Sequence, residues 1–125
     1  MMRNDIKNRK DVELLVNSFY ERVKQDAIIG FFFTDVVNMD WGKHLPLMYD
    51  FWEDIVFKSG VYKGNPINKH IDLNKKSLIT KEHFQRWLLL FNQTVEELFS
   101  GIFADLVKQR ATSIATVMQI KISKT

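Results

Sequence analysis

The sequence predicts an all-α fold with about four long helices and one or two short turns. Apolar residues recur at spacings of three and four in four separate segments, and no segment alternates with a period of two. Glycines, prolines and capping residues separate these segments. A chain of 125 residues can bury roughly two-thirds of the surface that its unfolded form exposes. We therefore expect a single domain spanning residues 1–125.

The first helix is expected over Lys10 to Gln25. Its apolar stripe consists of Val12, Leu15, Val16, Phe19 and Val23. Acidic residues near the start and basic residues near the end of this segment suit the helix dipole. The apolar segment "IIGFFFTDVV" follows, and Gly30 interrupts its pattern, so we expect a buried turn or a single helical turn there.

A second helix is expected after Asn38 or Asp40, either of which can cap it. Its apolar stripe consists of Trp41, Leu45, Met48, Trp52, Ile55 and Val56, with His44 on the same side. Pro46 lacks a backbone donor, and its ring presses on the carbonyl of Gly42. We therefore expect the regular helix to begin around His44 or Leu45, after a tighter turn.

A constrained loop follows the second helix. Gly60, Gly64 and Pro66 redirect the chain, and Asn68 can cap a short turn that carries His70. The third long helix is expected after Thr80, with the stripe Phe84, Trp87, Leu88, Phe91, Val95, Leu98 and Phe99, and Gly101 is expected to end it. The last helix is expected from Ile102 to about Ile122.

Composition excludes several classes of protein. The absence of cysteine rules out disulfides, iron–sulfur ligation and thiol catalysis. Basic residues are scattered among acidic ones and give a net charge of +3, so we expect no nucleic-acid partner. The longest apolar run, Trp87 to Phe91, is far shorter than the roughly 20 residues of a membrane span. The charged N-terminus shows no secretory signal, and we expect a soluble cytoplasmic protein.

Three histidines are the main candidates for site chemistry. His83 follows Glu82 at a helix start, and we expect it at the surface. His44 and His70 each lie among apolar residues, where a histidine bonded to the backbone is the commoner explanation. The chain lacks the ligand spacing of a zinc site, a nucleophile elbow, a phosphate loop and a dinucleotide motif. A planar cofactor that takes one axial imidazole in an aromatic slot, such as haem, fits the remaining pattern.

Tyr20 and Trp87 add two aromatic side chains with one polar donor each. Both lie on or beside a stripe that faces the core, and such donors need partners when they are buried. Each alone is well explained as a core aromatic. Together with the histidines and the cluster Phe31 to Phe33, they favour a polar pocket.

These residues and their order resemble the group III truncated haemoglobins, a family of short bacterial globins. The resemblance runs from Ser18 to the final helix through the motifs "FYERV", "FFF", "WxxHLPxMxDFW", "YxGxP…H" and "HFQRWLLLF". It implies a two-over-two helical sandwich around haem b. Doubled-glycine motifs of other truncated globin groups do not occur in this sequence.

The resemblance also implies residue roles. His70 corresponds to the proximal iron ligand, presented by the glycine-containing loop. Tyr20 and Trp87 correspond to distal hydrogen-bond donors, and His44 to a distal histidine that gates entry. Met48 would line the pocket and Phe33 would stack on the porphyrin. Lys63 and Lys69 are candidates for the propionate partners.

The function expected from this resemblance is binding of dioxygen and other diatomic ligands, with a reductase as partner and the chain as a monomer. Donors in a cavity of low dielectric hold a ligand that gains negative charge tightly. Nitric oxide or peroxide handling, or oxygen management, is therefore expected rather than carriage. Two alternatives remain open at this stage, a peroxidase-like haem enzyme that uses His44 as acid and base, and a haem-free helical interaction module.

Overall fold

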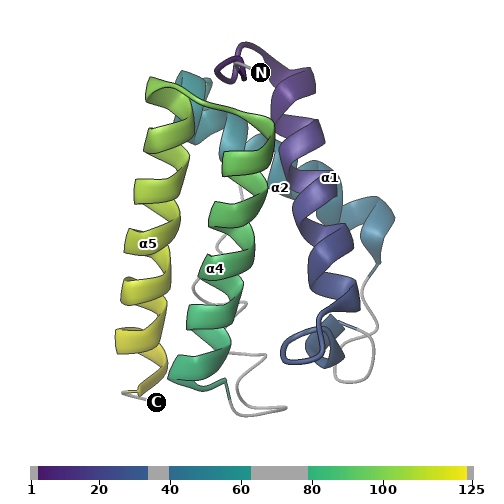
Figure 1. Ribbon diagram of the computed structural model, residues 1–125, viewed down its shortest axis with the longest axis vertical. Helices are drawn as coiled ribbons and strands as arrows, with labels where there is room; N and C mark the ends of the chain where they lie inside the picture. The colour runs from purple at the N-terminus through teal and green to yellow at the C-terminus, as the bar shows by residue number, and fades with distance from the viewer. Residues whose placement is uncertain (1–2, 34–39, 63–78, 124–125) are drawn as a thin grey trace.

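A computed structural model describes residues 3–33, 40–62 and 79–123 of the chain. The described part contains four long helices, which are α1 (Arg9–Gln25), α2 (Trp41–Phe57), α4 (Lys81–Leu98) and α5 (Ile102–Ser123). Figure 1 shows α4 and α5 side by side, α1 next to α4, and α2 crossing behind them. Helix α1 also packs on α2, and α2 also packs on α5. The predicted all-α fold is confirmed.

Helix α1 begins one residue before the predicted start. The Asn8 side chain accepts a hydrogen bond from the backbone N–H of Asp11 and satisfies one of the free donors of the first turn. Arg22 and Lys24 in the last turn complement the helix dipole. The stripe predicted from Val12 to Val23 is buried, together with Tyr20.

Helix α2 starts earlier than the sequence predicted. The expected start at His44 or Leu45 is wrong, because the helix begins at Trp41 and continues through Pro46. The tighter turn is present, since the backbone N–H of Lys43 donates to the carbonyl of Asp40 at 3.1 Å. Pro46 lies in the second turn, where its missing N–H removes a single bond from the helix. Aromatic packing of Trp41, described below, holds the first turn in place.

A compact turn follows α1, as predicted for the segment around Gly30. The Asp26 side chain accepts hydrogen bonds from the backbone N–H groups of Ile28 and Ile29, both at 3.1 Å. The N–H of Phe33 then donates to the carbonyl of Gly30 at 3.0 Å. A Cβ on Gly30 would lie 2.6 Å from the carbonyl oxygen of Asp26, so the turn closes too tightly for any other residue.

Thr80 caps α4, as the sequence predicted. Its hydroxyl accepts a hydrogen bond from the N–H of His83, and the His83 imidazole accepts one from the N–H of Thr80. This reciprocal pair is a capping box in which histidine takes the place usually held by Glu or Gln.

The N-terminal segment is fastened to the start of α5. The Asp5 carboxylate accepts hydrogen bonds from the N–H groups of Phe103 and Ala104, both at 2.9 Å, and so caps a helix almost 100 residues further along the chain. Gly101 adopts a φ of +146°, and a Cβ there would lie 2.5 Å from the Asp5 side chain. This close approach explains why a glycine occupies position 101, although α4 itself ends at Leu98, before the stop predicted at Gly101.

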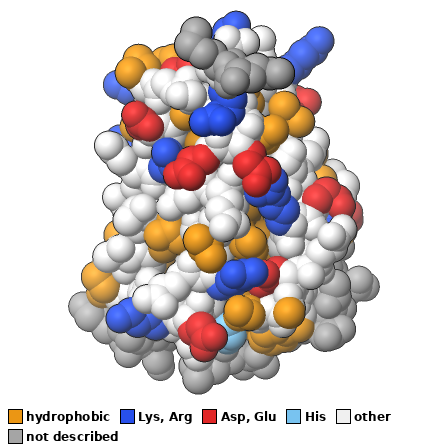
Figure 2. Space-filling model, in the orientation of Figure 1, with side chains coloured by type: hydrophobic (Ala, Val, Ile, Leu, Met, Phe, Trp, Pro, Cys, Tyr) orange, Lys and Arg blue, Asp and Glu red, His pale blue; other side chains and the backbone are white. Residues whose placement is uncertain are grey.

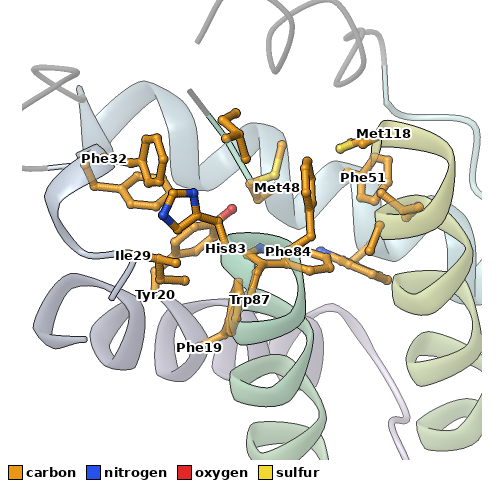
Figure 3. A pocket seen from close by; sticks show the side chains of 15 residues that line it. Phe19, Tyr20, Ile29, Phe32, Met48, Phe51, His83, Phe84, Trp87 and Met118 are labelled. Atoms are coloured by element: carbon orange, nitrogen blue, oxygen red, sulfur yellow. The ribbon is translucent and has the colours of Figure 1, made fainter. Parts of the chain in front are cut away.

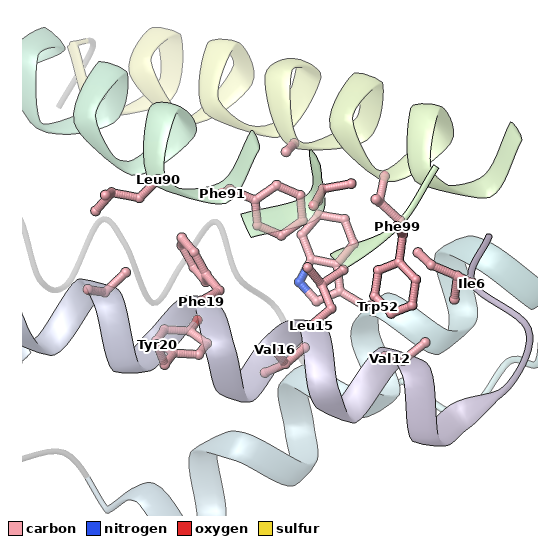
Figure 4. Packing of buried hydrophobic residues seen from close by; sticks show 14 of the residues in the cluster. Ile6, Val12, Leu15, Val16, Phe19, Tyr20, Trp52, Leu90, Phe91 and Phe99 are labelled. Atoms are coloured by element: carbon pink, nitrogen blue, oxygen red, sulfur yellow. The ribbon is translucent and has the colours of Figure 1, made fainter. Parts of the chain in front are cut away.

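The core lies between α1, α2 and α4, with one face of α5 closing it. Phe91 of α4 is fully buried and packs edge-on against Phe19 of α1, with ring centroids 5.2 Å apart. Trp52 of α2 stacks on the same ring at 4.7 Å. Figure 4 shows these rings meeting between the helices. Three helices are thereby joined through one phenylalanine.

Charged side chains are interspersed on the surface in view. Figure 2 shows basic and acidic groups close together on this face rather than in separate fields. Pairs such as Arg22 with Glu97, and Lys108 with Glu96, join α1 to α4 and α4 to α5. None of the helices in the described ranges combines the length and the hydropathy that crossing a bilayer requires.

Candidate functional site

An apolar cavity opens between the ends of the helices beside the main core. It encloses about 100 Å³, room for several water molecules. All four helices and the turn after α1 contribute side chains to it, as Figure 3 shows for ten labelled residues. The lining residues are Phe19, Tyr20, Ile29, Phe32, Phe33, Met48, Phe51, Trp52, Ile79, His83, Phe84, Trp87, Ile114, Ala115 and Met118.

Two hydrogen-bond donors predicted for the site meet in this cavity. Tyr20 comes from α1 and Trp87 from α4, and Figure 3 shows both side chains reaching toward Met48 of α2. Tyr20 contributes a hydroxyl and Trp87 an indole N–H, one hydrogen-bond donor each, to the cavity wall. Burial raises the pKa of Tyr20, so its hydroxyl stays protonated and keeps its capacity to donate.

Aromatic rings surround the Tyr20 side chain. Tyr20 is 8% exposed, and its ring meets those of His44 at 5.2 Å, Trp41 at 5.5 Å and Phe33 at 6.0 Å, all edge-on. His44 is half-buried beside Tyr20 rather than among the residues that line the cavity. His44 thus lies next to the cavity, and Phe33 and Met48 lie in its wall, while their expected roles toward haem stay predictions.

His83 differs from its prediction. It was expected at the surface, but it is half-buried and lines the cavity. Its ring packs edge-on against Phe32 at 4.8 Å and Phe31 at 5.8 Å. The cause is the capping box, because the bond from the Thr80 N–H to Nδ1 turns the imidazole toward the chain instead of toward solvent. That bond also places the proton of the neutral imidazole on Nε2.

An ion pair fixes the aromatic turn against α4. Asp26, whose side chain is 4% exposed, accepts hydrogen bonds from Arg86, one residue before Trp87. Burial alone would raise the pKa of this carboxyl, but the bonds from Arg86 and from the Ile29 and Ile28 N–H groups lower it below its ordinary value. The wall that contains Phe32 and Phe33 is thus tied to the helix that carries Trp87.

Three predicted site residues lie outside the described ranges. They are His70, the expected axial ligand, and Lys63 and Lys69, the expected propionate partners, all within residues 63–78. Their roles therefore remain predictions.

Comparison with known proteins finds similarity to truncated haemoglobins. The chain is 28% identical over 121 residues to the group 3 truncated hemoglobin ctb of Campylobacter jejuni, covering 94% of this chain and 93% of that protein. It superposes on the crystal structure of group III truncated hemoglobin from Campylobacter jejuni with a TM-score of 0.83, covering 97% of this chain and 95% of that one.

The protein has the fold of a truncated globin. Its resemblance to the group III truncated haemoglobins, inferred above from motifs, is confirmed. No family model matches the chain. The likeness therefore rests on the overall superposition and on pairwise identity.

The truncated globin fold also brings in residues that the sequence did not single out for the site. Trp52, Phe51, Ile114 and Met118 line the cavity together with His83. Trp52 belongs to the apolar stripe predicted for the second helix, and such stripes were expected to face the core. A cavity in the core uses the same stripe positions as packing does, so periodicity alone does not separate the two.

Proposed function

We propose that this protein binds haem b in the cavity between α1, α2 and α4, and that it binds dioxygen or another diatomic molecule at the iron. The pairing of Tyr20 with Trp87 carries this proposal. Both residues line an apolar cavity and each carries one hydrogen-bond donor. A ligand that gains negative charge would give both donors an acceptor there.

The lining suits a porphyrin chemically. Flat aromatic side chains from Phe33, Trp87 and Phe84 offer apolar contact, as cofactor pockets generally do. The free volume of about 100 Å³ is smaller than the several hundred cubic ångströms of a typical cofactor site. Binding of haem must therefore move the walls apart, and we expect a measurable change of protein structure on loading.

Each side chain then has a distinct task. Haem would supply an iron centre that binds diatomic ligands, and the His70 imidazole would hold the iron. The Tyr20 hydroxyl and the Trp87 N–H would donate hydrogen bonds to a bound ligand that carries negative charge. The low dielectric of the aromatic surroundings strengthens both bonds. His44, next to Tyr20, controls passage between solvent and the cavity.

Tight retention of the bound diatomic ligand favours redox chemistry over ligand transport. Two donors that hold a negatively charged ligand slow its release, whereas carriage depends on release. Nitric oxide or peroxide handling, or oxygen management with electrons from a reductase, is the function that fits this site best.

The absorption spectrum of the purified protein tests the proposal. A Soret band is expected, either as isolated or after addition of haem. His70→Gly should lose haem, and added imidazole should partly restore it. His44→Leu is the matched control and should retain haem, because His44 lies beside Tyr20 and outside the cavity lining. A wild-type chain that stays colourless with added haem would leave a helical interaction module as the better description.

A further inference from the structure

The first turn of α2 lacks the usual local stabilisation. Its cap residue, Asp40, makes no side-chain capping bond, and the first turn contains no acidic residue to complement the helix dipole. Gly42 and Pro46 are both poor helix formers. His44 is part of this segment, so whatever holds the turn also holds His44 against Tyr20.

Trp41, the first residue of α2, makes contacts that replace the missing cap. Its ring stacks on Phe33 at 5.8 Å with an interplanar angle of 30°. It meets Tyr20 at 5.5 Å and His44 at 5.7 Å, both edge-on. Trp41 does not itself line the cavity, and it therefore acts on the site through its neighbours.

Lys24 of α1 anchors this tryptophan. Its Nζ lies 4.4 Å from the centroid of the Trp41 ring, well within the range of a cation–π contact. The Lys24 side chain is 30% exposed and also pairs with Glu21 at 3.1 Å, which orients the ammonium group. The contact joins the last turn of α1 to the first turn of α2, one helical turn beyond Tyr20.

From these contacts we propose that Lys24 and Trp41 form a latch that keeps the first turn of α2 closed over Tyr20, and that ligand passage past His44 requires this latch to open. Trp41 is then a positioning residue for both Tyr20 and His44. The effect on ligand entry rests on the proposed haem function, whereas the closing of the helix turn does not.

The test compares Lys24→Gln, which removes the cation, with Lys24→Arg, which keeps it. Lys10→Gln, on the exposed side of the same helix, makes the same charge change away from the site. Amide hydrogen exchange over residues 40–50 should be about two- to fivefold faster in Lys24→Gln and unchanged in the other two, as loss of one cation–π contact implies. Trp41→Leu should accelerate exchange further, with Trp41→Phe in between.

A second readout uses the carbonyl complex of the haem-loaded protein. Lys24→Gln and Trp41→Leu should raise the bimolecular carbon monoxide association rate about two- to fivefold, measured by flash photolysis, and Lys24→Gln should leave haem content unchanged. Lys24→Arg should keep the wild-type rate. Equal exchange and equal entry rates in wild type, Lys24→Gln and Trp41→Leu would overturn the latch. A wild-type chain without haem would refute the haem proposal alone, since the exchange measurement would still decide whether the latch exists.

Discussion

Arg86 of α4 donates two hydrogen bonds to Oδ1 of Asp26, from Nε at 2.9 Å and from Nη2 at 2.6 Å. Oδ2 of the same carboxylate accepts hydrogen bonds from the backbone N–H groups of Ile28 and Ile29. One buried carboxylate therefore fixes both the aromatic turn and its distance from the helix that bears Trp87.

This relationship predicts a specific dependence of stability on pH. The pKa of Asp26 is lowered in the folded protein, so its contribution is fully present above the ordinary Asp value of 3.8 and is lost as the pH falls through the folded pKa. Asp26→Asn should lower the melting temperature at pH 7 and flatten its decline below about pH 4. Asp105→Asn, which changes an exposed acid of α5, is the control. An unaltered acid profile in Asp26→Asn would show that the pair does not hold the turn.

Substitution by alanine should have opposite effects on protein stability at Gly30 and at Gly42. Gly30→Ala places a Cβ 2.6 Å from the carbonyl oxygen of Asp26, so the turn must shift and carry Phe32 and Phe33 with it. At Gly42 the nearest atom is Oδ1 of Asp40 at 3.4 Å, an ordinary contact, and alanine favours the helix by roughly 0.5–1 kcal/mol. The melting temperature and the haem retention should both decrease in Gly30→Ala. In Gly42→Ala they should stay the same or increase. Matching losses in both variants would contradict this account.

The capping role of His83 can be tested separately from its place in the cavity wall. His83→Ala removes the acceptor for the Thr80 N–H and should destabilise the protein by about 1 kcal/mol. His83→Gln restores the usual capping-box residue and should recover most of that loss in urea unfolding. If glutamine restored stability but haem affinity stayed low, the imidazole would have a role in the cavity beyond capping.

The distal donors should control ligand release. A hydrogen bond to a charged group contributes about 1.5–3 kcal/mol, so Tyr20→Phe or Trp87→Phe should speed dioxygen release by roughly one to two decades. Carbon monoxide release should change less, because its outer atom carries little charge. In the proposed complex the two donors share one ligand, so the double variant is needed to measure their joint effect. Stopped-flow rates that stay at wild-type values in the double variant would make these residues ordinary core aromatics.

His44→Leu should affect the rate of ligand entry more than the rate of ligand release. Its ring packs edge-on against Tyr20 and Trp41 at the side of the cavity, rather than inside it. If His44 has the proposed gating role, leucine should change the association rate for carbon monoxide, while the dioxygen release rate shifts less than in the Tyr20 and Trp87 variants. A release rate that rises as much as in Tyr20→Phe would identify His44 as a third donor.

Much of the fold was predictable because helix stripes and caps are local signals. The α4 cap at Thr80 was predicted from neighbouring residues alone, whereas α4 ends at Leu98, before the stop predicted at Gly101. The start of α2 was not, because the packing of Trp41 on Lys24 and Phe33 depends on segments that meet only in the folded chain. The position of His83 was missed for a related reason. Its neighbours in sequence are charged, whereas its neighbours in space are Phe31 and Phe32.

The capping of α5 by Asp5 affects how the protein folds during synthesis on the ribosome. The hydrogen bonds to Phe103 and Ala104 join the first residues of the chain to its last helix. Helix α1 can form early, but the segment around Asp5 has no docking partner until α5 has been synthesised. Contacts so distant in sequence also form late during folding, since closing a long loop is slow. The nascent chain should therefore gain its protease resistance in a single step, once α5 has left the exit tunnel.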